Sequence, residues 1–242
     1  MKKAHIIGLD LGGTNFKIAL FDSSCRLIFK QVISTRRFIR KEKLIRAICD
    51  SVRQIAQANG LSKGDILGVG LGVPGPVDHR TGTVHFFPNL PWWKEVKLKT
   101  ILQKKMGLPV FLDNDAKLMA LAEYRFGEVR NLPNVLCLTL GTGVGGGLIL
   151  NGRLFRGQDN AAGEIGHLPI NVSGPSCNCK GRACLESYIG NSRILKEAKT
   201  AFGRDITLEE LSALAKKKNR LAVAPTTTSK RTIFLYPLSI LF

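Results

Sequence analysis

The sequence contains no long apolar run and no signal-like N-terminus. No segment reaches the ~18 uninterrupted apolar residues that a membrane-spanning helix needs. Met-Lys-Lys leads directly into an apolar stretch, without the small-residue cleavage site of a secretory signal. These absences predict a cytoplasmic α/β protein with no membrane partner, and its 242 residues suffice for one large domain or two medium ones.

A disulfide framework is also absent from the sequence. Of its six cysteines, Cys25, Cys49 and Cys137 are scattered in apolar contexts, and the other three cluster. This distribution fits a reducing compartment and indicates a metal site more than disulfides.

Acidic residues are scarce, with 18 Asp and Glu against 36 Lys and Arg, which gives a net charge of +18. Such an excess raises nucleic acid as a partner. Six of the basic residues, however, lie within 216–242, no acidic residue follows Glu210, and the others lie in stretches without interleaved aromatic residues. A solvated basic surface is therefore favoured over a nucleic-acid site.

What the sequence does contain is two glycine-rich loops, DLGGTN at 10–15 and LGTGVGGG at 140–147, each directly after an apolar run. Both predict a strand, a tight turn and a return strand, the first return strand beginning near Phe16 and the second covering 145–150. Glycines let backbone N–H groups approach an anion, so both turns are candidates for phosphate binding, and Asp10 is placed to orient a hydrated Mg²⁺. Neither loop fits a Walker or a Rossmann motif. Each alone is equally compatible with a hairpin that binds nothing, but two in the same context favour a nucleotide enzyme.

The remaining pattern alternates strands and helices. It predicts a third strand near 27–33, a helix over 41–60, a buried strand with a Pro-Gly-Pro turn over 66–78, a strand and helix over 109–123, and one or two amphipathic helices over 191–215. With the second hairpin, this order implies two similar lobes, 1–115 and 116–215. Residues 216–242 form an atypical tail without periodicity, for which a truncated or out-of-register end is favoured over a docking segment.

Asn114 and Asp115 lie where an apolar strand ends and a helix begins, the place at which open α/β sheets present ligand-binding groups. A carboxylate there can accept the proton of a substrate hydroxyl that attacks a phosphoryl group, so Asp115 is the candidate base. The alternative is a helix N-cap, a role that Asp and Asn also favour.

Asn89 lies in the loop PNLPWW beside two tryptophans. An amide with aromatic surface suits the hydroxyls and the apolar face of a sugar. Packing of Trp92 and Trp93 in the interior is an equal alternative.

One imidazole and three thiols, from His167, Cys177, Cys179 and Cys184, form a set suited to tetrahedral zinc. Free or redox-active thiols are the alternative. With four protein ligands, such a zinc would brace a loop without activating water. It would also fix the flanking carboxylates of Glu164 and Glu186, each of which could otherwise be a solvated acid.

Taken in order, the motifs DLGGTN, GVPGPVD, PNLPWW, DNDA, LGTGVGGG, AAGEIGH and CNCKGRACLE resemble those of the ROK family of bacterial sugar kinases and repressors. The resemblance covers residues 4 to about 195. It implies an α/β, two-lobed actin-like ATPase (ribonuclease H-like) fold whose second lobe is incomplete, MgATP as co-substrate, a hexose as acceptor, a structural zinc and a homodimer.

The resemblance also implies individual roles, with Asp115 contacting the sugar as the base toward its 6-hydroxyl. The implied sugar contacts are Asn89, Asn114, Glu164, His167 and Glu186, the implied ATP-phosphate contacts are Gly12, Gly13, Thr14, Gly141, Thr142 and Gly143 with Asp10 near Mg²⁺, and the implied zinc ligands are His167, Cys177, Cys179 and Cys184.

Three departures from the family pattern stand out. Lys180 and Ala183 replace glycines of the cysteine motif and are expected to strain the zinc loop, with Gly181 as the residue able to compensate. Lys117 stands where Asn is common, close enough to perturb the base. Family members also continue further, through the segment that packs on adenine, so half of the adenosine site is expected to be missing.

The leading hypothesis is therefore a glucokinase-like ATP:hexose 6-phosphotransferase. The second is a sugar-sensing regulator. Family repressors carry a helix-turn-helix before the first glycine loop, whereas here only five residues precede Ile6, so DNA binding would need the basic tail. The third is an inactive truncated remnant.

Overall fold

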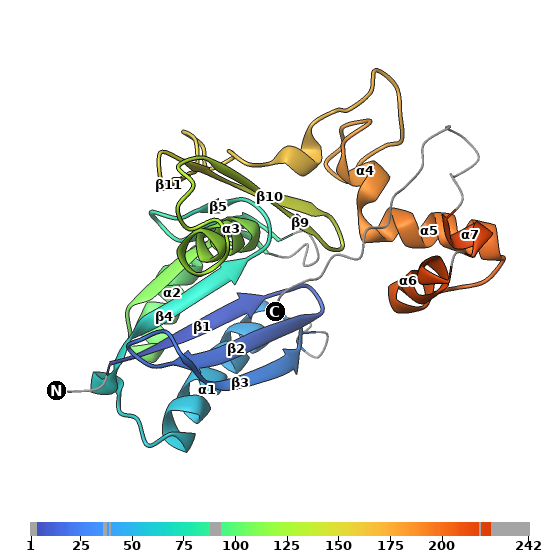
Figure 1. Ribbon diagram of the computed structural model, residues 1–242. Helices are drawn as coiled ribbons and strands as arrows, with labels where there is room; N and C mark the ends of the chain where they lie inside the picture. Colours follow the sequence, from blue (N-terminus) through green and yellow to red (C-terminus); the bar gives the residue numbers. More distant parts are fainter. Residues whose placement is uncertain (1–3, 36–37, 39, 88–92, 218, 224–242) are drawn as a thin grey trace. The chain divides into compact units, whose positions relative to one another are not determined.

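The structure is a computed structural model that describes residues 4–35, 38, 40–87, 93–217 and 219–223 (Figure 1). The chain folds into two compact units. One is made of residues 1–137 and 146–163, and the other of residues 138–145 and 164–242. This division differs from the predicted lobe boundary near residue 116, because the helix after that point packs on strands of the first unit. The boundary near 116 stays a prediction. Among the described residues, no helix is both long and apolar enough to cross a bilayer.

A five-stranded sheet in the order β3-β2-β1-β4-β8 organises the first unit. β1, β2 and β3 are antiparallel neighbours, whereas β4 and β8 run parallel to β1. The register aligns Ile18, Leu9, Leu71 and Leu112 in one row across four strands, and all four are buried. The bounds are β1 (His5–Leu11), β2 (Asn15–Phe21), β3 (Leu27–Ser34), β4 (Ile66–Val73) and β8 (Val110–Asn114).

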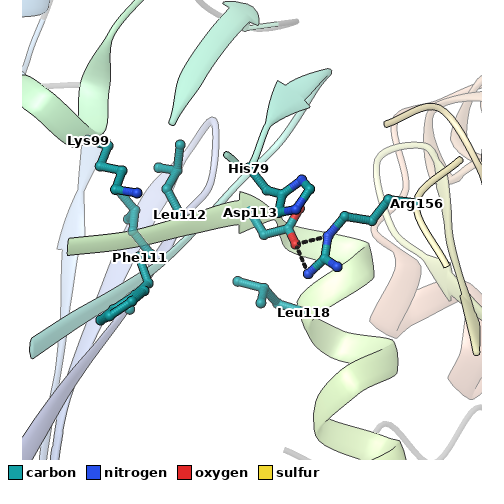
Figure 2. Close-up of a pocket in the computed structure, with 9 residues that line it drawn as sticks. His79, Lys99, Phe111, Leu112, Asp113, Leu118 and Arg156 are labelled. Atoms are coloured by element: carbon teal, nitrogen blue, oxygen red, sulfur yellow. Dashed lines mark hydrogen bonds and ion pairs between the residues drawn. The ribbon is translucent and has the colours of Figure 1, made fainter. Parts of the chain in front are cut away.

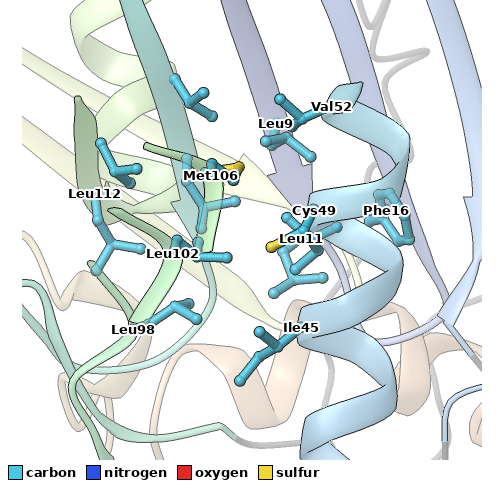
Figure 3. Close-up of a cluster of buried hydrophobic side chains, with 14 of the residues drawn as sticks. Leu9, Leu11, Phe16, Ile45, Cys49, Val52, Leu98, Leu102, Met106 and Leu112 are labelled. Atoms are coloured by element: carbon cyan, nitrogen blue, oxygen red, sulfur yellow. The ribbon is translucent and has the colours of Figure 1, made fainter. Parts of the chain in front are cut away.

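Two helices, α1 (Lys41–Ala58) and α2 (Leu98–Met106), cover the face of the sheet that carries this row (Figure 3). In α1 the predicted apolar stripe recurs every three or four positions, and its residues are buried: Leu44, Ile45, Ile48, Val52, Ile55 and Ala56. α1 is followed by Gly60 in a left-handed conformation (φ +64°), which confirms glycine as the stop signal.

The opposite face of the sheet receives α3 (Asp115–Phe126), because side chains alternate along a strand and Gly72 of β4 faces this helix. A Cβ on Gly72 would lie 3.5 Å from the Cα of Asp115, so glycine allows the close approach.

A second sheet has the order β11-β10-β9, and a third the order β5-β6-β7. The bounds are β5 (Val77–Asp78), β6 (Thr83–Phe86), β7 (Lys94–Val96), β9 (Val135–Leu140), β10 (Val144–Leu150) and β11 (Arg153–Phe155).

Short helices follow in the second unit, where Ala198, Ile206 and Leu211 form a small apolar cluster. The predicted amphipathic region 191–215 is thus two helices. Of the predicted tail 216–242, residues 224–242 lie outside the described part of the chain. The bounds are α4 (Glu186–Ile189), α5 (Asn191–Phe202), α6 (Leu208–Lys216) and α7 (Arg220–Val223).

Among the scattered cysteines, Cys49 is buried and Cys137 is half-buried. Cys25, by contrast, is exposed, so its expected apolar context is wrong. It lies in the β2–β3 turn and has a left-handed backbone (φ 60°).

Candidate active site and metal centre

The carboxyl ends of three parallel strands meet at one edge of the five-stranded sheet. The register places Asp10 of β1 beside Gly72 of β4, and Gly72 beside Asp113 of β8. Because neighbouring strands lie about 4.8 Å apart, Asp10 and Asp113 are about 10 Å apart across this edge. Parallel strands that end together gather their loops, so the first glycine turn and Asn114–Asp115 lie at the same edge, the usual ligand-binding place of such sheets.

The first glycine turn, residues 12–14, joins β1 to β2 in the predicted hairpin. Buried Thr35, just after β3, ties it down: its N–H donates to the carbonyl O of Thr14 at 2.8 Å and its Oγ1 donates to that of Gly13 at 2.9 Å. The half-exposed carboxylate of Asp10 lies 3.5 Å from Nζ of Lys17. The carbonyl groups of Gly13 and Thr14 are therefore engaged in hydrogen bonds within the fold.

Asn114, and not Asp115, caps α3. The Asn114 Oδ1 accepts the N–H of Lys117 at 3.1 Å, and its Nδ2 donates to the carbonyl O of Gly75 at 3.2 Å. The cap alternative is thus right for Asn114, which is buried. Asp115 is half-buried in the first turn of α3, and its Oδ1 accepts the N–H of Ala116 at 2.8 Å.

A cavity of about 200 Å³ opens beside this strand end (Figure 2). None of the predicted site residues lines it. Its polar lining includes the ion pair of buried Asp113 with Arg156, whose Nε and Nη2 donate to Asp113 Oδ2 at 2.9 and 2.8 Å. The lining residues are Gly70, Leu71, His79, Lys99, Phe111, Leu112, Asp113, Leu118 and Arg156.

The second glycine turn, residues 141–143, joins β9 to β10 as predicted, although the return strand begins at Val144, one residue earlier than expected. The N–H of Gly141 donates to the carbonyl O of Gly143 at 2.9 Å, and the N–H of Asn191 at the start of α5 donates to that of Gly141 at 3.0 Å. Helix α5 therefore holds this turn.

Glu186 connects the second glycine turn to the cysteine cluster. Its Oε2 accepts the N–H of Val144 at 2.9 Å, and its Oε1 lies 3.8 Å from Sγ of Cys177. A Cβ on Gly143 would collide with the Glu186 carboxylate, so a side chain here would force that carboxylate to move.

The predicted ligands His167, Cys177, Cys179 and Cys184 do come together, with all four ligand atoms within 4.8 Å of one another. Nδ1 of His167 lies 3.8 Å from Sγ of Cys177, and Sγ of Cys179 lies 3.6 Å from that of Cys184. A tetrahedral zinc with Zn–S bonds of about 2.3 Å places its ligand atoms about 3.8 Å apart. The donor set and its spacing therefore fit zinc.

The thiols of the cluster differ in their pKa values. Burial raises the pKa of Cys177, and burial with thiol hydrogen bonds raises that of Cys184 to about 12. The Gly181 N–H, which donates to Sγ of Cys179 at 3.4 Å, lowers the pKa of that thiol. Without a cation these buried thiols would be protonated, so a metal must displace their protons on binding.

The expected strain of the zinc loop is present. Lys180 has φ 70° and Ala183 has φ 55°, both in the left-handed region that favours glycine. Gly181 has no positive φ and so does not take up this conformation. Instead, its amide and lack of side chain let the thiols of Cys179 and Cys184 approach the backbone.

Comparison with known proteins identifies the fold and family. The family model described as "ROK family" matches residues 6–234. The chain belongs to the ROK family. This match confirms the sequence resemblance and extends past residue 195, where the resemblance was expected to end.

Its ROK relatives include both enzymes and regulators. The chain is 38% identical over 194 residues to a glucokinase of Thermotoga maritima, covering 80% of this chain and 60% of the relative. It is also 38% identical over 195 residues to a xylose repressor of Caldicellulosiruptor bescii, covering 80% of this chain and 48% of the relative. The chain thus spans about half to three-fifths of the length of these relatives.

A solved ROK structure shares the fold. The ROK glucokinase from Streptomyces griseus in complex with glucose and AMPPNP matches with a TM-score of 0.78 and 31% identity, over 91% of this chain and 73% of that one. The α/β fold of the ROK kinases, the actin-like ATPase fold, is confirmed.

The predicted ROK site residues fall into separate groups. Asp10, the first glycine turn, Asn114 and Asp115 belong to the first unit, whereas the second glycine turn, Glu164, Glu186 and the zinc ligands belong to the second. Glu164 is half-buried and precedes the short helical turn that carries His167. Asn89 and Trp92 lie outside the described residues. Trp93 is fully buried, 5.5 Å from Phe87 between ring centroids, so the packing alternative holds for it.

Sequence reasoning missed Thr35 and Arg156, which fix the two strand ends. Neither belongs to a motif, and each contacts a residue at least 22 positions away. An aspartate at the end of an apolar strand, as Asp113 is, gives the one signal that a cation must pair with it, and it does not say which cation.

Proposed function

We propose that this chain is the sugar- and nucleotide-binding part of an ATP-dependent sugar kinase that transfers the γ-phosphoryl group of MgATP to the 6-hydroxyl of a hexose, glucose being the first candidate. The observation that carries the proposal is the shared sheet edge, which gathers the first glycine turn and Asp115 in one unit. A phosphate-binding turn and a carboxylate that follow strand ends about 10 Å apart suit a donor and an acceptor that meet between them.

In this proposal Asp115 is the general base. Its neighbour Asn114 takes the cap role, so Asp115 is not required as the N-cap of α3. As the 6-hydroxyl attacks the γ-phosphorus, the Asp115 carboxylate accepts its proton and thereby avoids a charged intermediate on the sugar oxygen.

The two glycine turns would hold the ATP phosphates, with Asp10 beside the hydrated Mg²⁺. Metal and glycine N–H groups supply positive potential where the transferring group gains charge. The residues Asn89, Asn114, Glu164, His167 and Glu186 would bind the sugar hydroxyls. Zinc would be structural: it would fix His167 directly and Glu186 through Cys177, the thiol beside Oε1.

The test is glucose-dependent ADP release by the zinc-loaded chain with MgATP, compared with its Asp115→Asn variant. Loss of a general base costs about 100-fold to 10,000-fold in kcat. We expect a loss in this range with glucose affinity retained, as measured by titration calorimetry.

Asp205→Asn is the matched control, because Asp205 is 88% exposed and only its surface pair with Lys199 is lost. It should leave kcat unchanged. No sugar-dependent ADP release from the folded, zinc-loaded chain, or full turnover by Asp115→Asn, would contradict the proposal.

A sugar-binding ROK regulator without kinase activity is the second candidate, because the xylose repressor is as similar to this chain as the glucokinase is. The two differ in their ligands. A regulator predicts sugar binding, tested with xylose and glucose, without any sugar-dependent ADP release.

A further inference from the structure

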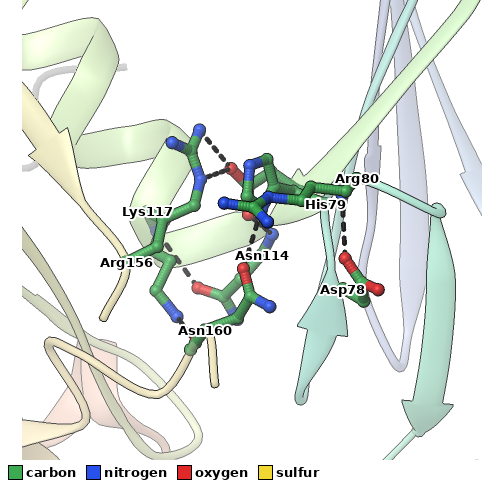
Figure 4. Close-up of polar contacts among 8 residues, drawn as sticks. Asp78, His79, Arg80, Asn114, Lys117, Arg156 and Asn160 are labelled. Carbon is green, nitrogen blue, oxygen red and sulfur yellow. Dashed lines mark hydrogen bonds and ion pairs between the residues drawn. The ribbon is translucent and has the colours of Figure 1, made fainter. Parts of the chain in front are cut away.

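A polar network of His79, Lys117 and Asn160 joins three segments of the first unit (Figure 4). Nζ of Lys117 in α3 donates to the carbonyl O of Asn160 at 2.6 Å. Nδ1 of His79, just after β5, lies 2.7 Å from Oδ1 of Asn160 and donates to it when it carries the ring proton. The network thus connects the start of α3, the loop after β5 and the segment after β11.

Two members of the network are in costly states. Lys117 is only 2% exposed, although an ammonium group loses its hydration on burial. Asn160 has φ 58°, in the left-handed region that a non-glycine residue adopts only at a cost. Such states persist when surrounding contacts require them, and they gather at functional sites. Here the two residues in these costly states are joined to each other by the hydrogen bond from Lys117 Nζ to the carbonyl O of Asn160.

The network lies beside the proposed catalytic groups in the chain. Lys117 lies two residues after Asp115, and its backbone N–H donates to the Oδ1 of the N-cap residue Asn114. Asn160 is four residues before Glu164, one of the proposed sugar contacts. Holding Lys117 and Asn160 together therefore fixes the start of the base-bearing helix against the segment that leads into Glu164.

We propose that His79, Lys117 and Asn160 are positioning residues for phosphoryl transfer, which set the orientation of Asp115 without contacting the substrate. This inference rests on the proposed kinase function. Misplacement of a reacting group by about 1 Å can cost about 100-fold in rate, so loss of one positioning hydrogen bond lowers kcat more than it lowers stability.

The experiment compares Asn160→Gly with Asn151→Gly. Glycine keeps the left-handed backbone and the carbonyl that Lys117 binds, and it removes only the bond to His79. Asn151 has φ 50° and lies in the β10–β11 turn, so it receives the same change away from the network. We expect about a tenfold fall in kcat for Asn160→Gly, with KM for ATP and the melting temperature held, and no change in kcat for Asn151→Gly.

Lys117→Met and His79→Ala complete the set. Lys117→Met keeps the buried stem and should lower kcat by about tenfold or more. His79→Ala should lower kcat as Asn160→Gly does, His79→Gln should restore part of it, and the double variant should be no worse than either single variant, because both remove the same bond.

The outcomes separate the two proposals. Turnover in the unsubstituted chain with kcat unchanged in Asn160→Gly and Lys117→Met overturns the positioning role alone. A fall in kcat matched by an equal fall in the folded fraction shows a merely structural role and also overturns it. Absence of sugar-dependent turnover in the unsubstituted chain overturns the kinase function and the positioning role together.

Discussion

The two glycine turns have nearly the same design in the sequence and are supported in different ways. The first is clamped by Thr35 at the end of a five-stranded sheet whose core is densely apolar. The second is held by polar groups, the N–H of Asn191 and the carboxylate of Glu186, the latter beside the thiol of Cys177. The comparison teaches that one glycine turn can depend on a hydrophobic core and the other on the polar groups beside a candidate zinc site.

Zinc removal should give the largest difference between the two turns, measured as amide hydrogen exchange. Chelation should raise amide hydrogen exchange at Val144 and Asn191 by about 100-fold or more, because zinc binding supplies the folding energy of such loops. Exchange at Thr35 should not change. The measurement is exchange by mass spectrometry with and without chelator, and equal effects on both turns would break the comparison.

Cys179→Ser should reproduce the effect of the chelator, whereas Cys25→Ser, at an exposed thiol outside the cluster, should not.

The pH dependence of zinc affinity gives a further check. Because the pKa values of Cys177 and Cys184 are raised, zinc must displace both protons, and its apparent affinity should fall by at least about 100-fold for each pH unit below neutrality. A flat profile in a zinc titration would contradict this.

A methyl group added to the second turn tests the Glu186 link directly. Gly143→Ala places its Cβ against the Glu186 carboxylate, whereas Gly141→Ala points into open space. We expect Gly143→Ala to cost about 1–3 kcal/mol in thermal unfolding and to weaken zinc binding. Gly141→Ala is the matched control and should cost far less. Equal losses would mean that Glu186 does not transmit the change.

Local patterns in the sequence predicted much of this arrangement. The turn positions, the stripe of α1 and the spacing of His167 and the cysteines are all features of neighbouring residues, and the structure confirms them. The clamps are different, since Thr35 and Arg156 reach partners 22 and 43 positions away and single polar residues have no period to reveal them. In the run Asp113–Asn114–Asp115, the same residue types suit both a helix cap and a general base. Only the observed bond from the Lys117 N–H assigns Asn114 as the cap.

At the first turn, Thr35→Val removes the hydroxyl that donates to Gly13 while keeping the shape of a buried side chain. One such hydrogen bond is worth about 1 kcal/mol. Thermal unfolding should show a loss of this size, the same with and without chelator. A loss that appears only in the zinc-loaded protein would show that the first turn also depends on the metal.

The smallest expected effect is a gain, at the two strained residues of the zinc loop. Lys180→Gly and Ala183→Gly keep the left-handed backbone and remove the Cβ that opposes it, so each should stabilise the loop by about 0.5–1 kcal/mol. This corresponds to about twofold to fivefold tighter zinc, measured by competition with a chelating dye. Lys180→Ala separates backbone from charge, because it removes the ammonium group and keeps the strain. If Lys180→Ala tightens zinc as much as Lys180→Gly, the lysine charge and not the backbone limits affinity; a gain confined to glycine shows that the loop tolerates strain which the zinc ligands impose.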